Sequence, residues 1–89
     1  MICNWCDSHM AYQDTNTVYW ELPDGTRAIT ILNTPCVTCP DCGMVYQEDN
    51  LTEEIEDQLL LINTRKLPDK LTYDELMKKE RLLKRNYFR

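Results

Sequence analysis

The chain has 89 residues, a formal net charge of −5 at pH 7 and 28% charged side chains. With one histidine and two glycines it offers neither a Ser/His/Asp constellation nor a glycine-rich phosphate loop, so we expect no enzymatic activity. It begins at Met1 without a charged leader or a long apolar run, which predicts a cytoplasmic protein with no membrane anchor.

Two Cys-x-x-Cys pairs lie in the N-terminal half of the chain, Cys3 with Cys6 and Cys39 with Cys42. Thiols stay reduced in the cytoplasm, so pairs at this spacing predict a metal site rather than a disulfide framework. Four thiolates around one ion leave no open position for water or substrate, which indicates a structural centre. Zinc is the metal that we expect, and iron is the alternative because it accepts the same four ligands.

The fifth cysteine, Cys36, forms an overlapping pair with Cys39, so the ligand set needs a choice. Pro40 presets φ for a tight turn and Gly43 relieves crowding after it, and both favour a knuckle at the later pair. Cys36 is therefore expected to be a small buried hydrophobe beside the site. His9 is expected at the surface rather than on the metal.

Between the two pairs, strand-like segments at 17–22 and 27–32 flank the sequence Pro-Asp-Gly-Thr at 23–26. These turn residues predict a β-hairpin. Alternation at period two places the apolar side chains on one face, and the second strand is expected to bend at Pro35 and to deliver Cys39 to the metal. The predicted core face of the hairpin consists of Val18, Trp20, Leu22, Ile29 and Ile31.

A short third strand is predicted near 44–46, and a helix follows it. Asn50 and Glu53 have the spacing of a capping box, which places the helix start at Asn50, and the helix is expected to end near Asn63. Its apolar residues recur at spacings of four, four and three, so they form a stripe that would cover the hairpin. The stripe consists of Leu51, Ile55, Leu59 and Ile62.

A second capping box, Thr72 with Glu75, follows a proline break and predicts a basic C-terminal helix that continues to Tyr87. The expected fold class is α+β: a zinc-tethered β-hairpin or three-stranded antiparallel meander, packed by one amphipathic helix, with the basic helix at the periphery. We divide the chain into a zinc-finger domain at 1–66 and a helical extension at 67–89.

The charge is uneven along the chain. Residues 1–69 carry three basic and twelve acidic side chains, whereas residues 70–89 carry seven basic and three acidic ones. The acidic part suits a basic protein partner, and the basic tail suits a weak contact with nucleic acid, a solvated face, or pairing with the acidic helix. A homodimer is a further expectation, because apolar residues of the tail need cover. The basic residues expected on the C-terminal helix are Lys78, Lys79, Arg81, Lys84, Arg85 and Arg89, and its apolar ones include Leu82, Leu83, Tyr87 and Phe88.

Longer motifs point to a known family. They are Tyr-Trp-Glu-Leu-Pro-Asp-Gly-Thr-Arg at 19–27, Cys-Pro-Asp-Cys-Gly-Met-Val-Tyr at 39–46 and Glu-Ile-Glu-Asp-Gln at 54–58, together with both cysteine pairs. On these motifs the chain resembles the YokU-like group of small antitoxins. The finger region is also similar to the YgiT-type zinc finger in the N-terminal half of MqsA antitoxins. The zinc ligands implied by this resemblance are Cys3, Cys6, Cys39 and Cys42.

In MqsA-type antitoxins the zinc-bearing half engages a protein toxin, and a separate helix-turn-helix half binds operator DNA. Residues 66–89 are too few for a helix-turn-helix, so the resemblance implies toxin binding without operator binding. A zinc-stabilised protein-interaction module is therefore our first functional interpretation. A small regulator that contacts nucleic acid through the basic tail is the alternative, and redox chemistry at an exposed Cys36 thiolate is a third.

Overall fold

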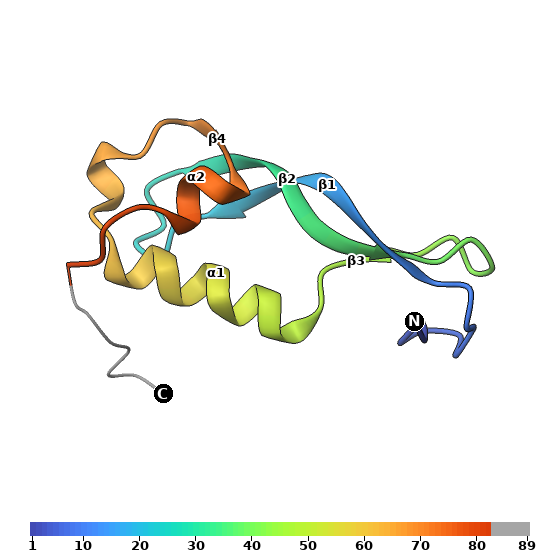
Figure 1. The fold of residues 1–89 in the computed structure, drawn as a ribbon. Coiled ribbons are helices and arrows are strands. Elements are labelled where there is room, and N and C mark those ends of the chain that lie inside the picture. The colour runs from blue at the N-terminus through green and yellow to red at the C-terminus, as the bar shows by residue number, and fades with distance from the viewer. Residues whose placement is uncertain (83–89) are drawn as a thin grey trace.

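The computed structural model describes residues 1–82, which form an α+β fold (Figure 1). Two long antiparallel strands, β1 (Tyr12–Glu21) and β2 (Ala28–Thr38), make its centre. β3 (Val45–Tyr46) pairs antiparallel with the end of β2, which confirms the predicted three-stranded antiparallel sheet. The helices gather toward one end of the hairpin, and the N-terminal segment and the β2–β3 turn lie at the other end.

The turn of the hairpin forms as predicted. The Asp24 carboxylate accepts hydrogen bonds from the backbone N–H and the hydroxyl of Thr26, at 3.0 and 2.7 Å. Gly25 has φ of 71°, and its N–H donates to the carbonyl oxygen of Leu22 at 2.8 Å. A left-handed residue is required here, and glycine adopts that conformation without steric cost.

A β-bulge interrupts the hairpin near its middle. Val18 lies opposite Ile31 and Asn16 lies opposite Thr34, so two steps along β1 match three steps along β2. Asn33 has φ of 54°, a left-handed conformation that asparagine tolerates better than most residues. The extra residue reverses the alternation of β2, so that odd-numbered side chains before the bulge share a face with even-numbered ones after it.

The bulge gives the two ends of β2 different partners. Ile31 faces the helices and shares its face with Cys36, whereas Val37 points to the opposite face. Instead of the bend predicted at Pro35, the irregularity lies two residues earlier and Pro35 stays within the strand. Within the described residues β4 pairs with 30–32 and β3 with 37–38, so Pro35 lies where β2 lacks a second neighbour and where a missing N–H is tolerated.

The main core lies between the hairpin and α1 (Asp49–Leu61), as the apolar stripe predicts. The predicted capping box at Asn50 does not form, because the helix begins one residue earlier with Glu48 as an N-cap that makes no side-chain hydrogen bond. The helix ends at Leu61 with Ile62 as its C-cap, close to the predicted end near Asn63. The buried residues of this core are Leu22, Ile29, Ile31, Ile55, Leu59, Ile62, Leu67, Leu71 and Leu76, and Val18, Trp20 and Leu51 pack against it.

A fourth strand, β4 (Lys70–Thr72), was not predicted. It follows a 3-10 turn, η1 (Thr64–Lys66), and pairs in parallel with β2, with Leu71 opposite Ile31. Three residues are too few to show a periodicity, so the sequence carried no signal for it. The segment after residue 66 therefore packs on the same core as the hairpin. The division of the chain into domains at 1–66 and 67–89 stays a prediction.

Arg27 holds the segment that leads into β4. Its guanidinium group pairs with the Asp69 carboxylate at 2.5 Å and donates to the carbonyl oxygens of Thr64 and Leu67, at 3.1 and 2.6 Å. Several donors in a rigid, planar group allow one side chain to satisfy a whole turn. Arg27, which comes directly before β2, thus connects the hairpin to the segment at 64–69.

The second helix, α2 (Tyr73–Met77), begins with the predicted capping box. The Thr72 hydroxyl accepts from the Glu75 N–H at 3.1 Å, and the Glu75 carboxylate accepts from the Thr72 N–H at 3.0 Å. The helix ends at Met77, so the prediction of a long basic helix is wrong for the residues that the structure describes. Its expected continuation over 83–89 lies outside them.

A buried glutamine explains why α2 is short. The amide nitrogen of Gln58 donates to the carbonyl oxygens of Leu76 and Lys79, at 2.9 and 3.0 Å, and its oxygen accepts from Arg81 at 2.7 Å. These contacts satisfy carbonyl groups that a further helical turn would otherwise use.

In the described part of the chain, no helix has the length and apolarity needed to cross a membrane.

The capping box gives a test of how far α2 stabilises the fold. Replacing Thr72 by alanine removes the hydroxyl acceptor and should lower the free energy of unfolding by about 1 kcal/mol. Urea denaturation of the variant and of Thr72→Ser, which keeps the hydroxyl, measures the effect. Equal loss in both variants would show that the cap contributes nothing.

Candidate metal centre

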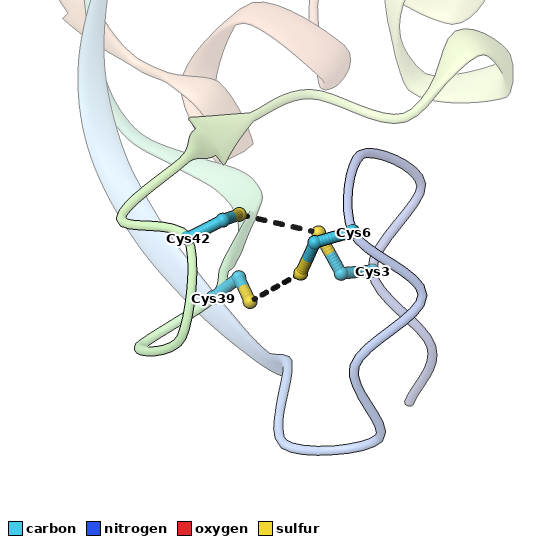
Figure 2. A group of neighbouring side chains, drawn as sticks. All are labelled: Cys3, Cys6, Cys39 and Cys42. Atoms are coloured by element: carbon cyan, nitrogen blue, oxygen red, sulfur yellow. Dashed lines mark hydrogen bonds between the residues drawn. The ribbon is translucent and has the colours of Figure 1, made fainter.

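The structure brings Cys3, Cys6, Cys39 and Cys42 together at the end of the sheet away from α2 (Figures 1 and 2). The sulfur atoms of Cys3 and Cys42 lie 3.7 Å apart, and those of Cys6 and Cys39 lie 3.5 Å apart. All four lie within 4.8 Å of one another. Two segments separated by the whole hairpin thus present four thiols to one point, a group that could hold a metal ion.

The first pair lies in a tight turn before β1. The Cys3 N–H donates to the Ser8 carbonyl oxygen at 2.9 Å, and the Asp7 N–H donates to the Cys3 carbonyl oxygen at 3.0 Å. The N–H of Trp5 points at the Cys3 sulfur at 3.3 Å. Backbone donors aimed at a sulfur stabilise its thiolate form, which is the form that binds metal.

The second pair lies in a turn with the same hydrogen bonds. The Cys39 N–H donates to the Met44 carbonyl oxygen at 3.0 Å, and the Gly43 N–H donates to the Cys39 carbonyl oxygen at 2.9 Å. Gly43 and Asp7 each follow the first cysteine of their pair by four residues, and they have φ of 76° and 60°. The two knuckles therefore share one backbone geometry.

The left-handed conformation of Asp7 was not predicted from the sequence, because aspartate indicates such a turn less clearly than glycine does. Aligning the two knuckles on their cysteines would have revealed it, since Asp7 then falls on Gly43. A side-chain contact between the knuckles was also missed: the Ser8 hydroxyl donates to the Asp41 carboxylate. This contact joins the two turns at the surface, beside the sulfur cluster.

The sulfur cluster perturbs the pKa values of its own thiols. Burial acts to raise the pKa of Cys3, but N–H groups of Trp5 and Cys6 and the neighbouring sulfurs outweigh it and lower the pKa to about 7. The Ser8 N–H acts to lower the pKa of Cys6, but burial and the other three sulfurs outweigh it and raise the pKa to about 12. Without a cation the cluster accommodates one thiolate readily and resists the next, so metal binding must release protons.

Little apolar material supports this end of the molecule. The buried cluster here contains Cys3, Ala11, Val37 and Cys39, with Tyr46 packed against it. The Tyr46 hydroxyl accepts a hydrogen bond from the Asn4 N–H at 3.0 Å and so fixes the first knuckle to β3. A core of this size cannot by itself offset the entropy of ordering two turns, so cross-linking by a metal is the term that would hold this end together.

The other two candidate ligands lie outside the cluster. Cys36 is buried, with 5% of its surface exposed, and it faces the side of the sheet opposite Val37. Burial raises the pKa of its thiol, and the Asp14 carboxylate raises it further, although a bond from Thr38 acts to lower it. Cys36 is therefore a buried thiol, as the sequence predicts. Burial and a raised pKa disfavour redox chemistry there, because the reactive form of cysteine is an accessible thiolate. His9 is exposed and is not part of the sulfur group.

Four thiols on two matching knuckles, attached to a small α+β fold, define a domain with a candidate metal centre. The chain belongs to the YokU-like family: it matches the family described as "YokU-like protein, putative antitoxin" over residues 2–88. It is similar to the "Uncharacterized protein YokU" of Bacillus subtilis (strain 168), with 63% identity over 86 residues that cover 97% of this chain and 94% of the relative. No solved structure matches the chain.

The overlapping cysteine pairs provide a matched test of the ligand set. Cys39→Ala should abolish binding of a metal ion and lower the free energy of unfolding by about 4 kcal/mol or more, the range typical of a lost metal site. Cys36→Ala should keep the metal and cost about 1 kcal/mol, because it leaves only a small cavity. Elemental analysis and thermal denaturation of both variants measure these effects. Full metal content in Cys39→Ala would contradict the assignment.

Proposed function

We propose that Cys3, Cys6, Cys39 and Cys42 hold one structural zinc ion. A tetrahedral zinc with zinc–sulfur bonds of about 2.3 Å sets its ligand sulfurs about 3.8 Å apart. Two of the sulfur–sulfur distances, 3.5 and 3.7 Å, are close to this value, and all four sulfurs lie within 4.8 Å of one another. Because four thiolates fill the coordination shell, the ion would have a folding role and no catalytic one.

Removing the metal tests this proposal. The purified protein should contain one zinc per chain and should be colourless, whereas an iron centre would be red. A strong chelator should unfold the zinc end, because ligand binding and folding are one equilibrium in small metal domains. Amide hydrogen exchange of residues 1–12 and 37–46 before and after chelation measures this. Unchanged protection in a metal-free sample would contradict a structural role.

We further propose that the chain is a non-enzymatic interaction module that binds and neutralises a protein toxin. Family membership supports this. The resemblance of the finger region to the YgiT-type finger of MqsA antitoxins adds a functional analogy. The observation that carries the proposal is charge: residues 1–69 have twelve acidic and three basic side chains. A toxin that acts on RNA needs a basic surface, and such a surface would be attracted to this one.

The alternative is a regulator that contacts nucleic acid through its basic C-terminal segment. Lys78 and Lys79 support it, because both are exposed directly after α2. Lys70 and Arg81 are also described, whereas Lys84, Arg85 and Arg89 lie outside the described part of the chain. Arg81 itself donates to Gln58, so it has a structural role as well. The protein-binding proposal is favoured because most of the described surface would repel phosphates.

Affinity capture separates the two functions. The zinc-loaded chain should retain a basic protein from a Bacillus subtilis lysate at low salt, and the yield should fall at high salt because the attraction is screened. Nuclease treatment should leave the yield unchanged. A blank capture at low salt would contradict the antitoxin proposal, and a salt-dependent gel shift with RNA or DNA would support the alternative.

A further inference from the structure

One part of the helix-facing side of the sheet is only partly covered in the described structure. Alternation and strand register place Tyr12, Asp14 and Cys36 on the same face as the main core, and Val45 lies on that face beyond them. α1 begins only at Asp49, and Figure 1 shows it extending away from β3 toward the other end of the sheet. Beyond the first turn of α1, Tyr12, Asp14 and Val45 are exposed on this face, whereas Cys36 is buried.

A groove occupies this open region. It has a volume of about 480 Å³ and lies between the two strands and the start of α1, with Asp14, Cys36, Glu48 and Leu51 among its lining residues. Tyr12 and Val45 continue the same face toward the zinc end, and they are 49% and 48% exposed. We call these six residues the open face.

The charge of the open face is negative. Asp14 and Glu48 line the groove, Asp49 follows directly in the first turn of α1, and no basic residue lines the groove. The N-terminus of α1 adds about half a positive charge, which three carboxylates outweigh. Within residues 1–82, Asp14 and Glu48 form no ion pair; Asp14 accepts hydrogen bonds only from Thr15 and Thr38, at 2.8 and 3.3 Å. Both carboxylates therefore keep acceptor sites for a cation.

We propose that the open face is the docking surface for a basic protein, and that its groove takes a lysine or arginine side chain of that protein. The carboxylates of Asp14 and Glu48 would receive the charged group, while Leu51 and Cys36 would pack against its aliphatic stem. Tyr12 offers an exposed aromatic ring at the rim, on which a second cation can stack. This inference rests on the proposed protein-binding function and names the surface that performs it.

The chemistry of the surface selects this occupant over two others. Nucleic acid would bring phosphates against Asp14, Glu48 and Asp49, which repel them. A second copy docked symmetrically would bring the same carboxylates together, and like charges at an interface core are unfavourable. A basic protein is the class of partner whose charge and apolar stems both match the open face.

Two tyrosines of β1 allow a matched cross-linking test. Tyr12 lies on the open face, whereas Tyr19 is 78% exposed on the opposite face of the same strand. Each is replaced in turn by p-benzoylphenylalanine, the chain is produced in Bacillus subtilis, and cross-linked peptides are identified after irradiation. We expect position 12 to cross-link to a lysine- or arginine-bearing segment of another protein, and position 19 to give at most a tenth of that yield.

Other results would overturn the proposal. A stronger product from position 19, or products from position 12 that consist only of RNA or of this chain itself, would show that another surface is used. If affinity capture recovers a partner but position 12 gives no product, the docking surface is wrong while the proposed function stands. If both experiments are blank, the two proposals fail together.

Two double variants with the same change in net charge test the groove itself. Asp14→Asn combined with Glu48→Gln removes two negative charges from the open face, and Glu21→Gln combined with Glu80→Gln removes two elsewhere. Against the partner identified by cross-linking, the first double variant should weaken binding about tenfold and the second less than about twofold, because only close charges contribute strongly. Equal losses of affinity in the two double variants would show that only net charge matters, and would overturn the assignment of the groove.

Discussion

Four sulfur atoms within 4.8 Å of one another are the constraint on which this structure depends. Such a cluster is unfavourable as four thiolates without a cation, because like charges repel at these distances, and it has only a minimal apolar core beside it. A bound cation would reverse both effects, because it neutralises the thiolates and cross-links turns that the chain separates by a whole hairpin. Coordination of a metal ion would thus organise the cysteine end, and apolar burial organises the helical end.

A single extra residue in β2 lets these two modes of stabilisation share one strand. Without the bulge at Asn33, strict alternation would place Val37 on the face of Ile31, and the knuckle side of the sheet would lose its buried contact. With the bulge, Ile31 serves the helical core and Val37 serves the metal end. The same shift leaves Cys36 and Asp14 on the helix-facing side, where they line a groove beside the start of α1.

Sequence reasoning predicted those parts of the fold that short-range chemistry determines. The hairpin turn, the apolar faces of hairpin and helix, and the Thr72–Glu75 capping box each follow from a few neighbouring residues, and all are confirmed. The parallel strand β4 and the early end of α2 were missed, because they depend on distant partners such as Arg27 and Gln58. For the metal centre, cysteine spacing indicated the four thiols, but the left-handed Asp7 emerged only from the paired geometry of the two knuckles.

The long hairpin also changes how strongly an ion is held. Cys6 and Cys39 are separated by 32 residues, yet pairing of Tyr12 with Thr38 brings the chain segments next to them together before any ion arrives. Loop-closure entropy grows with the logarithm of loop length, so replacing a loop of this size by a few flexible residues is worth about 1 kcal/mol to metal capture. The strands therefore act as a tether that raises the effective concentration of one knuckle near the other. Metal affinity would then depend on the whole sheet, and a substitution that destabilises the hairpin far from the sulfurs would lower the affinity of the four cysteines for a metal ion.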